Sequence, residues 1–309
     1  MNIVLSFIGK LPGYIVECIH QIRCYYKDDV YIIIDDLSSD YLKMIDKYDV
    51  NIIDYESVKS KRMVDTYIRN STKFDLVRGL TGREQLFLRS IERFFLLQNL
   101  MSQKDLQNVL FLEIDNLIYD NPYVWLPEFS KHELCYMYDD VDRCSTGLMY
   151  VKSYQSLKPL LEHIVEYIED TNTTYITEMY ATYQYFNNKY KKNQEDPSVQ
   201  LLPTIWNIEN INSFAHMNYG KYGDTVFDAL AIGCYLLGCD TFHTRGQIIL
   251  HQKAKWCDID YTKYSLTWKS DYLGRKKPYI WNGEKWLLIN NLHVHSKDLK
   301  SGLSVPMDE

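Results

Sequence analysis

The stretch NVLFLEIDNLIYDNP, residues 108–122, decides the fold and the candidate site. Its apolar run, residues 109–112, is typical of a buried strand and ends in two acids, Glu113 and Asp115, one residue apart. Carboxylates at the end of a buried strand are costly unless a cation meets them there. The stretch therefore predicts a core strand that ends at a cation site.

The chain before this strand alternates strand and helix. The runs NIVLSFI (2–8) and DVYIIID (29–35) predict strands, and residues 12–26 carry apolar side chains at helical spacing between them. A third strand, VNIIDY (50–55), precedes a polar stretch, 57–78, that we expect to be an irregular insertion, and a long amphipathic helix, 83–101. This order predicts an α/β fold with a mixed, mainly parallel sheet flanked by helices.

Polar residues stand where these strands end. Parallel strands with helical crossovers present ligands at their carboxyl ends, at one rim of the sheet. The residues at this rim are Ser6, Asp35, Asp36, Glu113 and Asp115. Asp35 and Asp36 have an alternative role, as caps of a helix that begins near Ser38.

The second half of the chain is less regular. It predicts helices at 156–168, 175–190 and 224–238, and a hairpin in PYIWNGEKWLLI, whose strands join at Asn282-Gly283. The hairpin leads into NNLHVHSKDLKSG, residues 290–302. Residues two apart in a strand share a face, so His293 and His295 should point the same way, with Lys297 beyond them.

Together these side chains suit a metal–diphosphate site. Two carboxylates on one side of a strand end are hard oxygen donors for Mg²⁺ or Mn²⁺, which keep positions for substrate phosphates. A neutral imidazole of His293 or His295 can complete the coordination, and Lys297 can meet phosphate oxygens. The alternative is that both histidines are partly buried strand residues without a ligand.

Composition narrows the function classes. The chain has 309 residues, 46% of them apolar, and a formal net charge of -7, which argues against a protein that tracks nucleic-acid phosphates. No apolar window approaches the ~20 residues of a membrane span. The seven cysteines include no CxxC pair and are typical of reduced thiols, so we expect a cytoplasmic protein, in the host cytoplasm if the source is viral.

Five segments resemble glycosyltransferases of the GT-A fold that use nucleotide sugars. They are VLFLEIDNLIYDNP, STGLMYVKS, TEMYATYQYF, VFDALAIGCYLLGCD and NLHVHSKDL. More narrowly, the chain resembles bacterial and large-DNA-virus proteins that end in an LHIHSK-like segment. The resemblance implies one Rossmann-like GT-A domain with a C-terminal elaboration. Residues 1–120 would be the donor half, ending in the ExD motif, and 121–309 the acceptor half with the C-terminal metal-binding segment.

The resemblance also implies roles for single residues. Asp115 and His295, or His293 instead, would hold Mn²⁺ or Mg²⁺ on the donor diphosphate. Glu113 departs from the usual first Asp of the motif and would contact the donor ribose or a metal-bound water. The remaining donor contacts would be Ser6 and Ile8 at the base, Asp35 or Asp36 at the nucleoside, and Arg93 with Arg89 at the phosphates, unless the arginines are solvated or paired with Glu92. A UDP-sugar is the first choice of donor.

Transfer of a hexosyl or pentosyl group to a glycan or other hydroxyl acceptor also requires a catalytic carboxylate. The candidates are Asp228, which we favour, Glu178, and Asp139 or Asp140 in the acidic loop. Two of these acids have a structural alternative: Glu178 near a helix start would only favour the helix dipole, and Asp228 would only orient a backbone turn.

Two other functions fit the same motifs. A sugar-phosphate nucleotidyltransferase shares the sheet and the acidic site, although FIGKLPGYI lacks the expected Gly-rich basic loop. The second alternative is a non-catalytic protein that binds a nucleotide sugar or a glycan. The sequence gives no oligomeric state.

Overall fold

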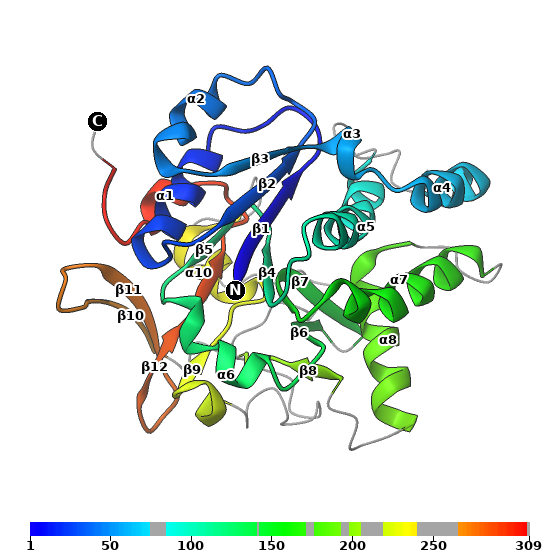
Figure 1. Cartoon of the computed structure of the whole chain (residues 1–309). Coiled ribbons are helices and arrows are strands. Elements are labelled where there is room, and N and C mark those ends of the chain that lie inside the picture. Colours follow the sequence, from blue (N-terminus) through cyan, green and yellow to red (C-terminus); the bar gives the residue numbers. More distant parts are fainter. Residues whose placement is uncertain are drawn as a thin grey trace.

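The computed structural model describes residues 1–74, 85–140, 142–170, 176–192, 198–204, 219–239 and 265–307 (Figure 1). Its centre is a seven-stranded sheet in the order β3-β2-β1-β4-β7-β6-β8. The strands are β1 (Asn2–Phe7), β2 (Val30–Ile34), β3 (Asn51–Asp54), β4 (Val109–Leu112), β6 (Leu134–Asp140), β7 (Arg143–Val151) and β8 (Val199–Leu201). The first four run parallel, whereas β7 is antiparallel to both β4 and β6. The predicted α/β fold with a mixed, mainly parallel sheet is confirmed.

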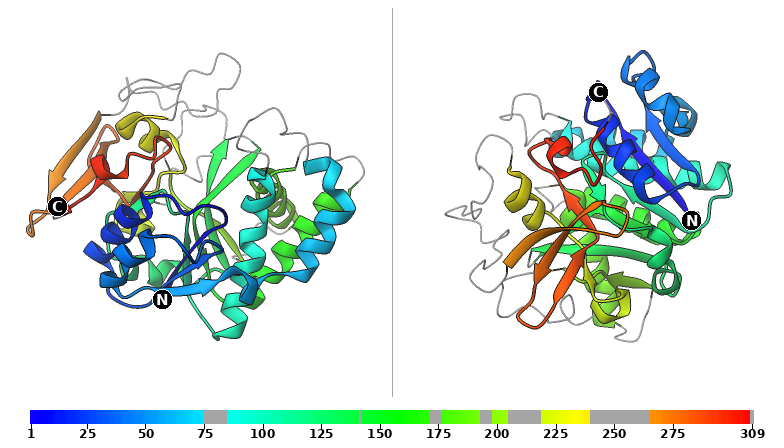
Figure 2. Two further views of the ribbon diagram at one scale, coloured as in Figure 1. Left: turned by 90° about the horizontal axis from the view of Figure 1, so that it is seen from above. Right: turned by 90° about the vertical axis from the view of Figure 1, so that its left-hand side faces the viewer.

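Helices cover both faces of this sheet (Figure 2). The longer ones are α1 (Ile15–Tyr25), α4 (Lys61–Phe74), α5 (Leu86–Gln103), α7 (Tyr154–Glu169) and α8 (Glu178–Lys192). Shorter ones are α2 (Tyr41–Ile45), α3 (Tyr55–Val58), α6 (Leu126–Phe129), α10 (Ala231–Leu237) and the 3-10 helices η1 (Asp46–Tyr48), η3 (Pro122–Val124), η4 (Tyr219–Tyr222) and η5 (Leu299–Gly302). Figure 2 shows α1 with the C-terminal strands on one side of the sheet and α5 with α7 on the other.

The two faces of the sheet make two hydrophobic cores. Side chains alternate along a strand, so in β1 Ile3 and Leu5 join the core beneath α1, and Val4 joins the core beneath α5 and α7. Ile15, Ile19 and Ile22 recur at helical spacing and bury one face of α1, as predicted. The cores thus hold the carboxyl ends of β1, β2 and β4 at one rim.

Two small sheets complete the fold. Four strands, β9 (Thr225–Val226), β10 (Ser265–Ser270), β11 (Lys276–Trp281) and β12 (Trp286–Ile289), pair in the order β10-β11-β12-β9. The predicted hairpin is confirmed, with Gly283 at a φ of 99° in the turn between β11 and β12. The other sheet pairs β5 (Asn116–Ile118) antiparallel with β13 (Asn291–His293), which joins the strand after the ExD motif to the C-terminal segment.

Two predicted segments differ from the structure. Residues 61–74 of the expected irregular insertion form α4, because Met63, Thr66 and Phe74 bury one side of it. The expected helix over 224–238 is helical only in α10, since Thr225 and Val226 pair with β12 and the chain then bends through Asp228.

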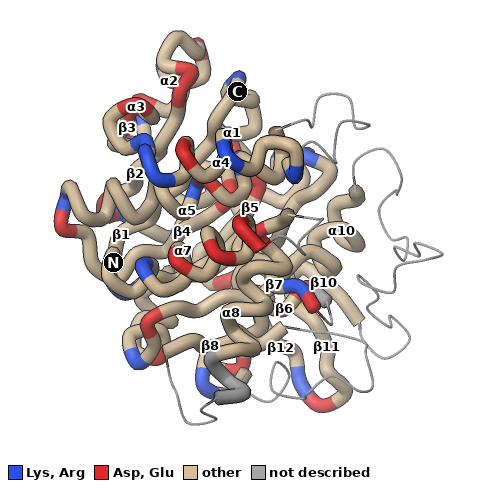
Figure 3. The backbone as a smooth tube through the Cα atoms, turned by 90° about the vertical axis from the view of Figure 1, so that its right-hand side faces the viewer, with Lys and Arg blue, Asp and Glu red and all other residues tan. Residues whose placement is uncertain are grey.

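Basic and acidic residues are interspersed along the described backbone in the view of Figure 3. Among the described residues, no helix is both long and apolar enough to cross a membrane.

Candidate metal and nucleotide-sugar site

The ExD motif lies in a tight turn at the carboxyl end of β4. The Glu113 N–H donates to Gly147 O on the neighbouring strand β7 at 2.8 Å, and the Asn116 N–H donates to Glu113 O at 3.0 Å. β1 lies between β2 and β4, and open α/β sheets bind ligands outside such a point, where chain connections leave in opposite directions. Glu113 and Asp115 therefore stand at the rim where a ligand is expected.

Strand β13 brings a histidine to these acids. It pairs with β5 so that His293 lies opposite Asn116, and the Val294 N–H donates to Asp115 O at 2.8 Å. His293 Nε2 is 3.1 Å from a Glu113 carboxylate oxygen and 3.6 Å from an Asp115 one. The three possible ligand atoms lie within 4.8 Å of one another, an arrangement that can hold a metal ion. We call these three residues the carboxylate–histidine cluster.

Neighbouring cations keep both acids of the cluster charged. Burial alone would raise the pKa of Glu113, but Arg93 and His293 outweigh it and lower the pKa to about 2. Burial is likewise outweighed at Asp115, where His293 and Lys297 hold the pKa well below its usual range. Conversely, the two carboxylates hold the pKa of His293 well above its usual range against the effect of burial. Both acids of the cluster are therefore ionised, as carboxylates that bind a metal ion must be.

The predicted Lys297 lies beside this cluster, where it pairs with Asp115. It has a φ of 62°, and its N–H donates to Val294 O at 3.1 Å, so the chain reverses after β13 and returns the amine to the acids. His295 is a neighbour of His293, with ring centroids 4.9 Å apart. Burial lowers the pKa of His295 to about 4, which leaves a neutral imidazole. Of the two histidines, His293 is the one that lies against the acids.

Arg93 pairs with the Glu113 carboxylate oxygen that His293 does not face, and it also meets Glu178. The Arg93 guanidinium on α5 pairs with Glu113, donates to Thr146 Oγ1 at 2.9 Å and lies 3.6 Å from Glu178. Glu178, in the first turn of α8, also accepts from Ser90 Oγ at 2.6 Å. Arg93 is 7% exposed, and its buried guanidinium links α5 to the turn after β4, to β7 and to α8.

Arg89, the second predicted phosphate contact, pairs with an acid of its own helix. Arg89 forms an ion pair with Glu92, which is the alternative that the helical spacing suggested.

The other predicted carboxylates lie in different surroundings. Asp228 is 1% exposed, and its two oxygens accept three backbone N–H groups, from Ile232, Gly233 and His293. Burial raises its pKa, while those donors oppose the shift. Asp139 is buried and pairs with Arg143. The backbone of Asp140 ends β6, and its side chain lies outside the described ones.

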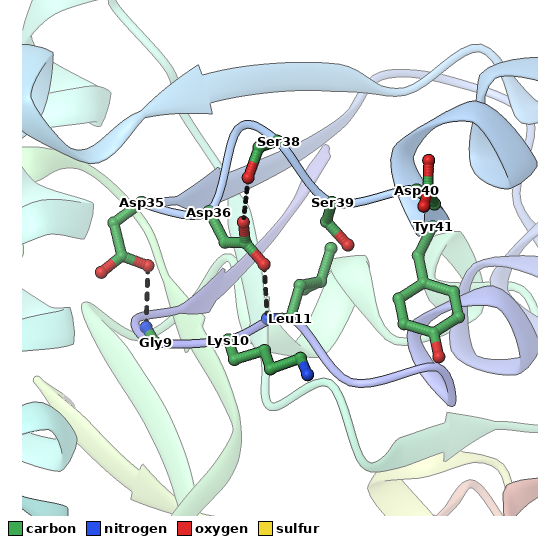
Figure 4. Close-up of a pocket in the computed structure, with 9 residues that line it drawn as sticks. All are labelled: Gly9, Lys10, Leu11, Asp35, Asp36, Ser38, Ser39, Asp40 and Tyr41. Carbon is green, nitrogen blue, oxygen red and sulfur yellow. Dashed lines mark hydrogen bonds between the residues drawn. The ribbon is translucent and has the colours of Figure 1, made fainter.

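A pocket of about 730 Å³ opens at the carboxyl ends of β1 and β2 (Figure 4). Asp35 accepts the Gly9 N–H at 2.7 Å, and Asp36 accepts the Leu11 N–H at 3.2 Å. These acids therefore hold the loop after β1. Asp36 also accepts from Ser38 Oγ, but α2 begins at Tyr41 without a side-chain cap.

The residues that line this pocket are Gly9, Lys10, Leu11, Asp35, Asp36, Ser38, Ser39, Asp40 and Tyr41. Ser6 and Ile8 are half-buried at the end of β1 and are not among them; Ile8 packs against the core beneath α5.

Two buried asparagines at the site were not predicted. Asn116 in β5 and Asn291 in β13 are fully buried, and Asn291 Nδ2 donates to Asn116 Oδ1 at 2.7 Å. A signal was present in the sequence, because each asparagine lies in a short apolar strand close to a candidate ligand. Asn116 directly follows Asp115, and Asn291 lies two residues before His293.

No model of a protein family matches the chain, and no curated protein sequence matches it. Among solved structures, the chain is similar to mouse xyloside xylosyltransferase 1 (11% identity, 71% of this chain and 91% of that one, TM-score 0.41) and to the galactosyltransferase LgtC in complex with donor and acceptor sugar analogues (12% identity, 66% and 73%, TM-score 0.41). It is also similar to a cytidylyltransferase from Leptospira borgpetersenii (9% identity, 66% and 75%, TM-score 0.35). These TM-scores are below 0.5, so we base the function on this chain's own side chains.

Proposed function

We propose that the protein is a metal-dependent glycosyltransferase of the GT-A type that transfers a sugar from a nucleoside-diphosphate sugar to a hydroxyl acceptor. The observation that carries this proposal is the convergence of Glu113, Asp115 and His293 at the carboxyl end of β4, with their ligand atoms within 4.8 Å of one another. A sheet rim of this kind is where α/β proteins bind nucleotides. In this protein the rim also carries two carboxylates, the imidazole of His293 and the amine of Lys297.

The metal-ligand set of Glu113, Asp115 and His293 fits Mn²⁺ or Mg²⁺. Carboxylate oxygens suit both ions, and an imidazole nitrogen suits Mn²⁺ better than Mg²⁺. When bound, such an ion would neutralise charge on the diphosphate leaving group. Glu113, Asp115 and His293 would hold it, and the neutral His295 would stand beside them.

The chain's own groups would do the remaining work at the donor. Lys297 would meet a phosphate oxygen once Asp115 turns to the ion, and would stabilise the leaving group as a point charge. The pocket at Asp35 and Asp36 would take the nucleoside, for which uridine is our first choice. In this assignment residues 1–120 bind the donor, and residues 121–309 bind the acceptor and carry the C-terminal metal-binding segment with His293 and Lys297.

Glu178 is linked to Glu113 through Arg93, and we therefore assign it as the first acid to test. Asp228 is a weaker choice, because both of its carboxylate oxygens already accept backbone N–H groups. Asp140 stays a prediction from the sequence.

Incubation with UDP-, GDP- and TDP-sugars, with and without Mn²⁺, tests the function. We expect one nucleoside diphosphate to be released, by transfer or slow hydrolysis, only when Mn²⁺ or Mg²⁺ is present. Asp115→Asn should abolish this release, whereas Asp54→Asn, at an exposed cap of α3, should not. Metal-independent release, or full activity of Asp115→Asn, would refute the metal assignment.

The same assay distinguishes the nucleotidyltransferase alternative. A nucleotidyltransferase given a nucleoside triphosphate and a sugar phosphate would release pyrophosphate, whereas we expect none.

A further inference from the structure

Asp228 and His293 are 65 residues apart in the sequence but in contact in the fold. We infer that Asp228 is a positioning residue, which fixes His293 against Glu113 and Asp115 through backbone hydrogen bonds. This inference rests on the proposed metal site, and it assigns Asp228 a task different from that of a base.

The carboxylate of Asp228 is directed at the backbone. One oxygen accepts the N–H of His293 at 3.0 Å and that of Gly233 at 2.8 Å, and the other accepts the Ile232 N–H at 2.9 Å. A carboxylate with three backbone donors inside the protein is held in one orientation. Asp228 thereby ties β13 to the first turn of α10.

The next residue orients the imidazole ring. His293 Nδ1 lies 2.9 Å from Ala229 O, and because a carbonyl oxygen can only accept, Nδ1 carries a proton. Nε2 is then the atom that faces Glu113 and Asp115, at 3.1 and 3.6 Å. Residues 228 and 229 therefore fix both the main chain and the ring of His293, as outer-shell partners of metal-binding histidines do.

Asn116 and Asn291 extend this support to the central sheet. Asn291 accepts the Asp228 N–H at 3.0 Å and donates to Asp228 O at 2.9 Å. Asn116 accepts from Asn291 and donates to Gly147 O at 3.0 Å, on strand β7. Both asparagines are 0% exposed, so these bonds do not compete with water.

Close packing leaves the loop little freedom. A Cβ on Gly233 would lie 2.2 Å from His293 O and 2.8 Å from an Asp228 oxygen. A Cβ on Gly147 would lie 2.9 Å from Asn116 Nδ2 and 3.2 Å from His293 Nδ1. Backbone and side chains at these two points can approach only because both residues are glycine.

Asp228→Asn tests the inference, because the amide is isosteric but turns an N–H₂ group towards N–H donors. We expect the dissociation constant for Mn²⁺, measured by calorimetry, to rise about 10- to 100-fold, as for other outer-shell changes. The kcat at saturating Mn²⁺ should return close to the wild-type value. The matched control is Asp271→Asn, whose carboxylate also accepts two backbone N–H groups but lies in the β10–β11 turn.

The outcomes separate the two proposals. If wild-type protein does not bind Mn²⁺, the proposed metal site fails, and the positioning role fails with it. If the wild type binds Mn²⁺ and Asp228→Asn binds it equally well, the positioning role alone is refuted. Lost kcat at unchanged Mn²⁺ affinity would make Asp228 the base.

A measurement on the wild type covers the case in which Asp228→Asn does not fold. With Zn²⁺ as a diamagnetic probe, long-range ¹H–¹⁵N spectra should show a neutral His293 with its proton on Nδ1. A proton on Nε2 in the Zn²⁺-bound protein would overturn the inference.

Discussion

The buried guanidinium of Arg93 allows a quantitative test of how the carboxylate–histidine cluster is held. Arg93 pairs with Glu113, lies 3.6 Å from Glu178 and donates to Thr146 at 2.9 Å. Replacement by methionine keeps an apolar chain in place and removes the charge. Removing one partner of a buried ion pair costs about 3–5 kcal/mol. We therefore expect Arg93→Met to lower the free energy of unfolding by about that amount.

Urea denaturation measures this loss, and an exposed ion pair provides the control. Arg69 pairs with Glu169 at 2.6 Å, with side chains 57% and 43% exposed, and such pairs contribute about 0–1 kcal/mol. Mn²⁺ should return part of the stability lost in Arg93→Met, since an ion that binds only the folded state stabilises it. If Arg93→Met costs no more than Arg69→Met at equal m-values, the reasoning about the buried network is wrong.

Three further predictions concern Lys297, Gly233 and His163. Lys297→Met should lower kcat with the nucleotide sugar by about 10²-fold, as removal of one group that stabilises developing negative charge does. Mn²⁺ should bind at least as tightly to this variant, because Lys297 no longer competes for Asp115. Weaker Mn²⁺ binding would contradict the prediction. Gly233→Ala should destabilise the fold by about 1–3 kcal/mol in urea denaturation, because its Cβ would lie 2.2 Å from His293 O, and an unchanged stability would show that the loop can shift. Burial lowers the pKa of His163, so below a pH of about 6.5 the unfolded chain binds more protons than the folded protein and the free energy of unfolding falls. His163→Phe should lose this part of the acid sensitivity in urea denaturation at pH 7 and pH 5. An unchanged pH dependence in the variant would refute the prediction.

Local patterns in the sequence predicted the sheet and its rim. Alternation and apolar runs placed β1, β2, β3 and β4, and polar residues after them indicated the rim that carries Glu113 and Asp115. The spacing of His293 and His295 predicted that they share a side, and their rings are in contact. These features succeed because they depend on neighbours within a few residues.

The errors arose where distant contacts override local preference. Residues 61–74 have many charges and appeared irregular, yet burial of Met63 and Phe74 makes them helical. The apolar run around Asp228 appeared to be one helix, but the Asp228 side chain and pairing with β12 bend the chain there. Neither the contact between Asp228 and His293 nor the contact between Asn116 and Asn291 could be predicted from spacing, because 65 and 175 residues separate the partners.

Anomalous diffraction at the manganese edge, from crystals grown with Mn²⁺ and UDP, tests the central claim most directly. We predict one strong peak between the Glu113 and Asp115 carboxylates and His293 Nε2, with the diphosphate beside Lys297. Crystals with UDP bound but no manganese at that cluster, or with manganese held elsewhere, would contradict the account of this site.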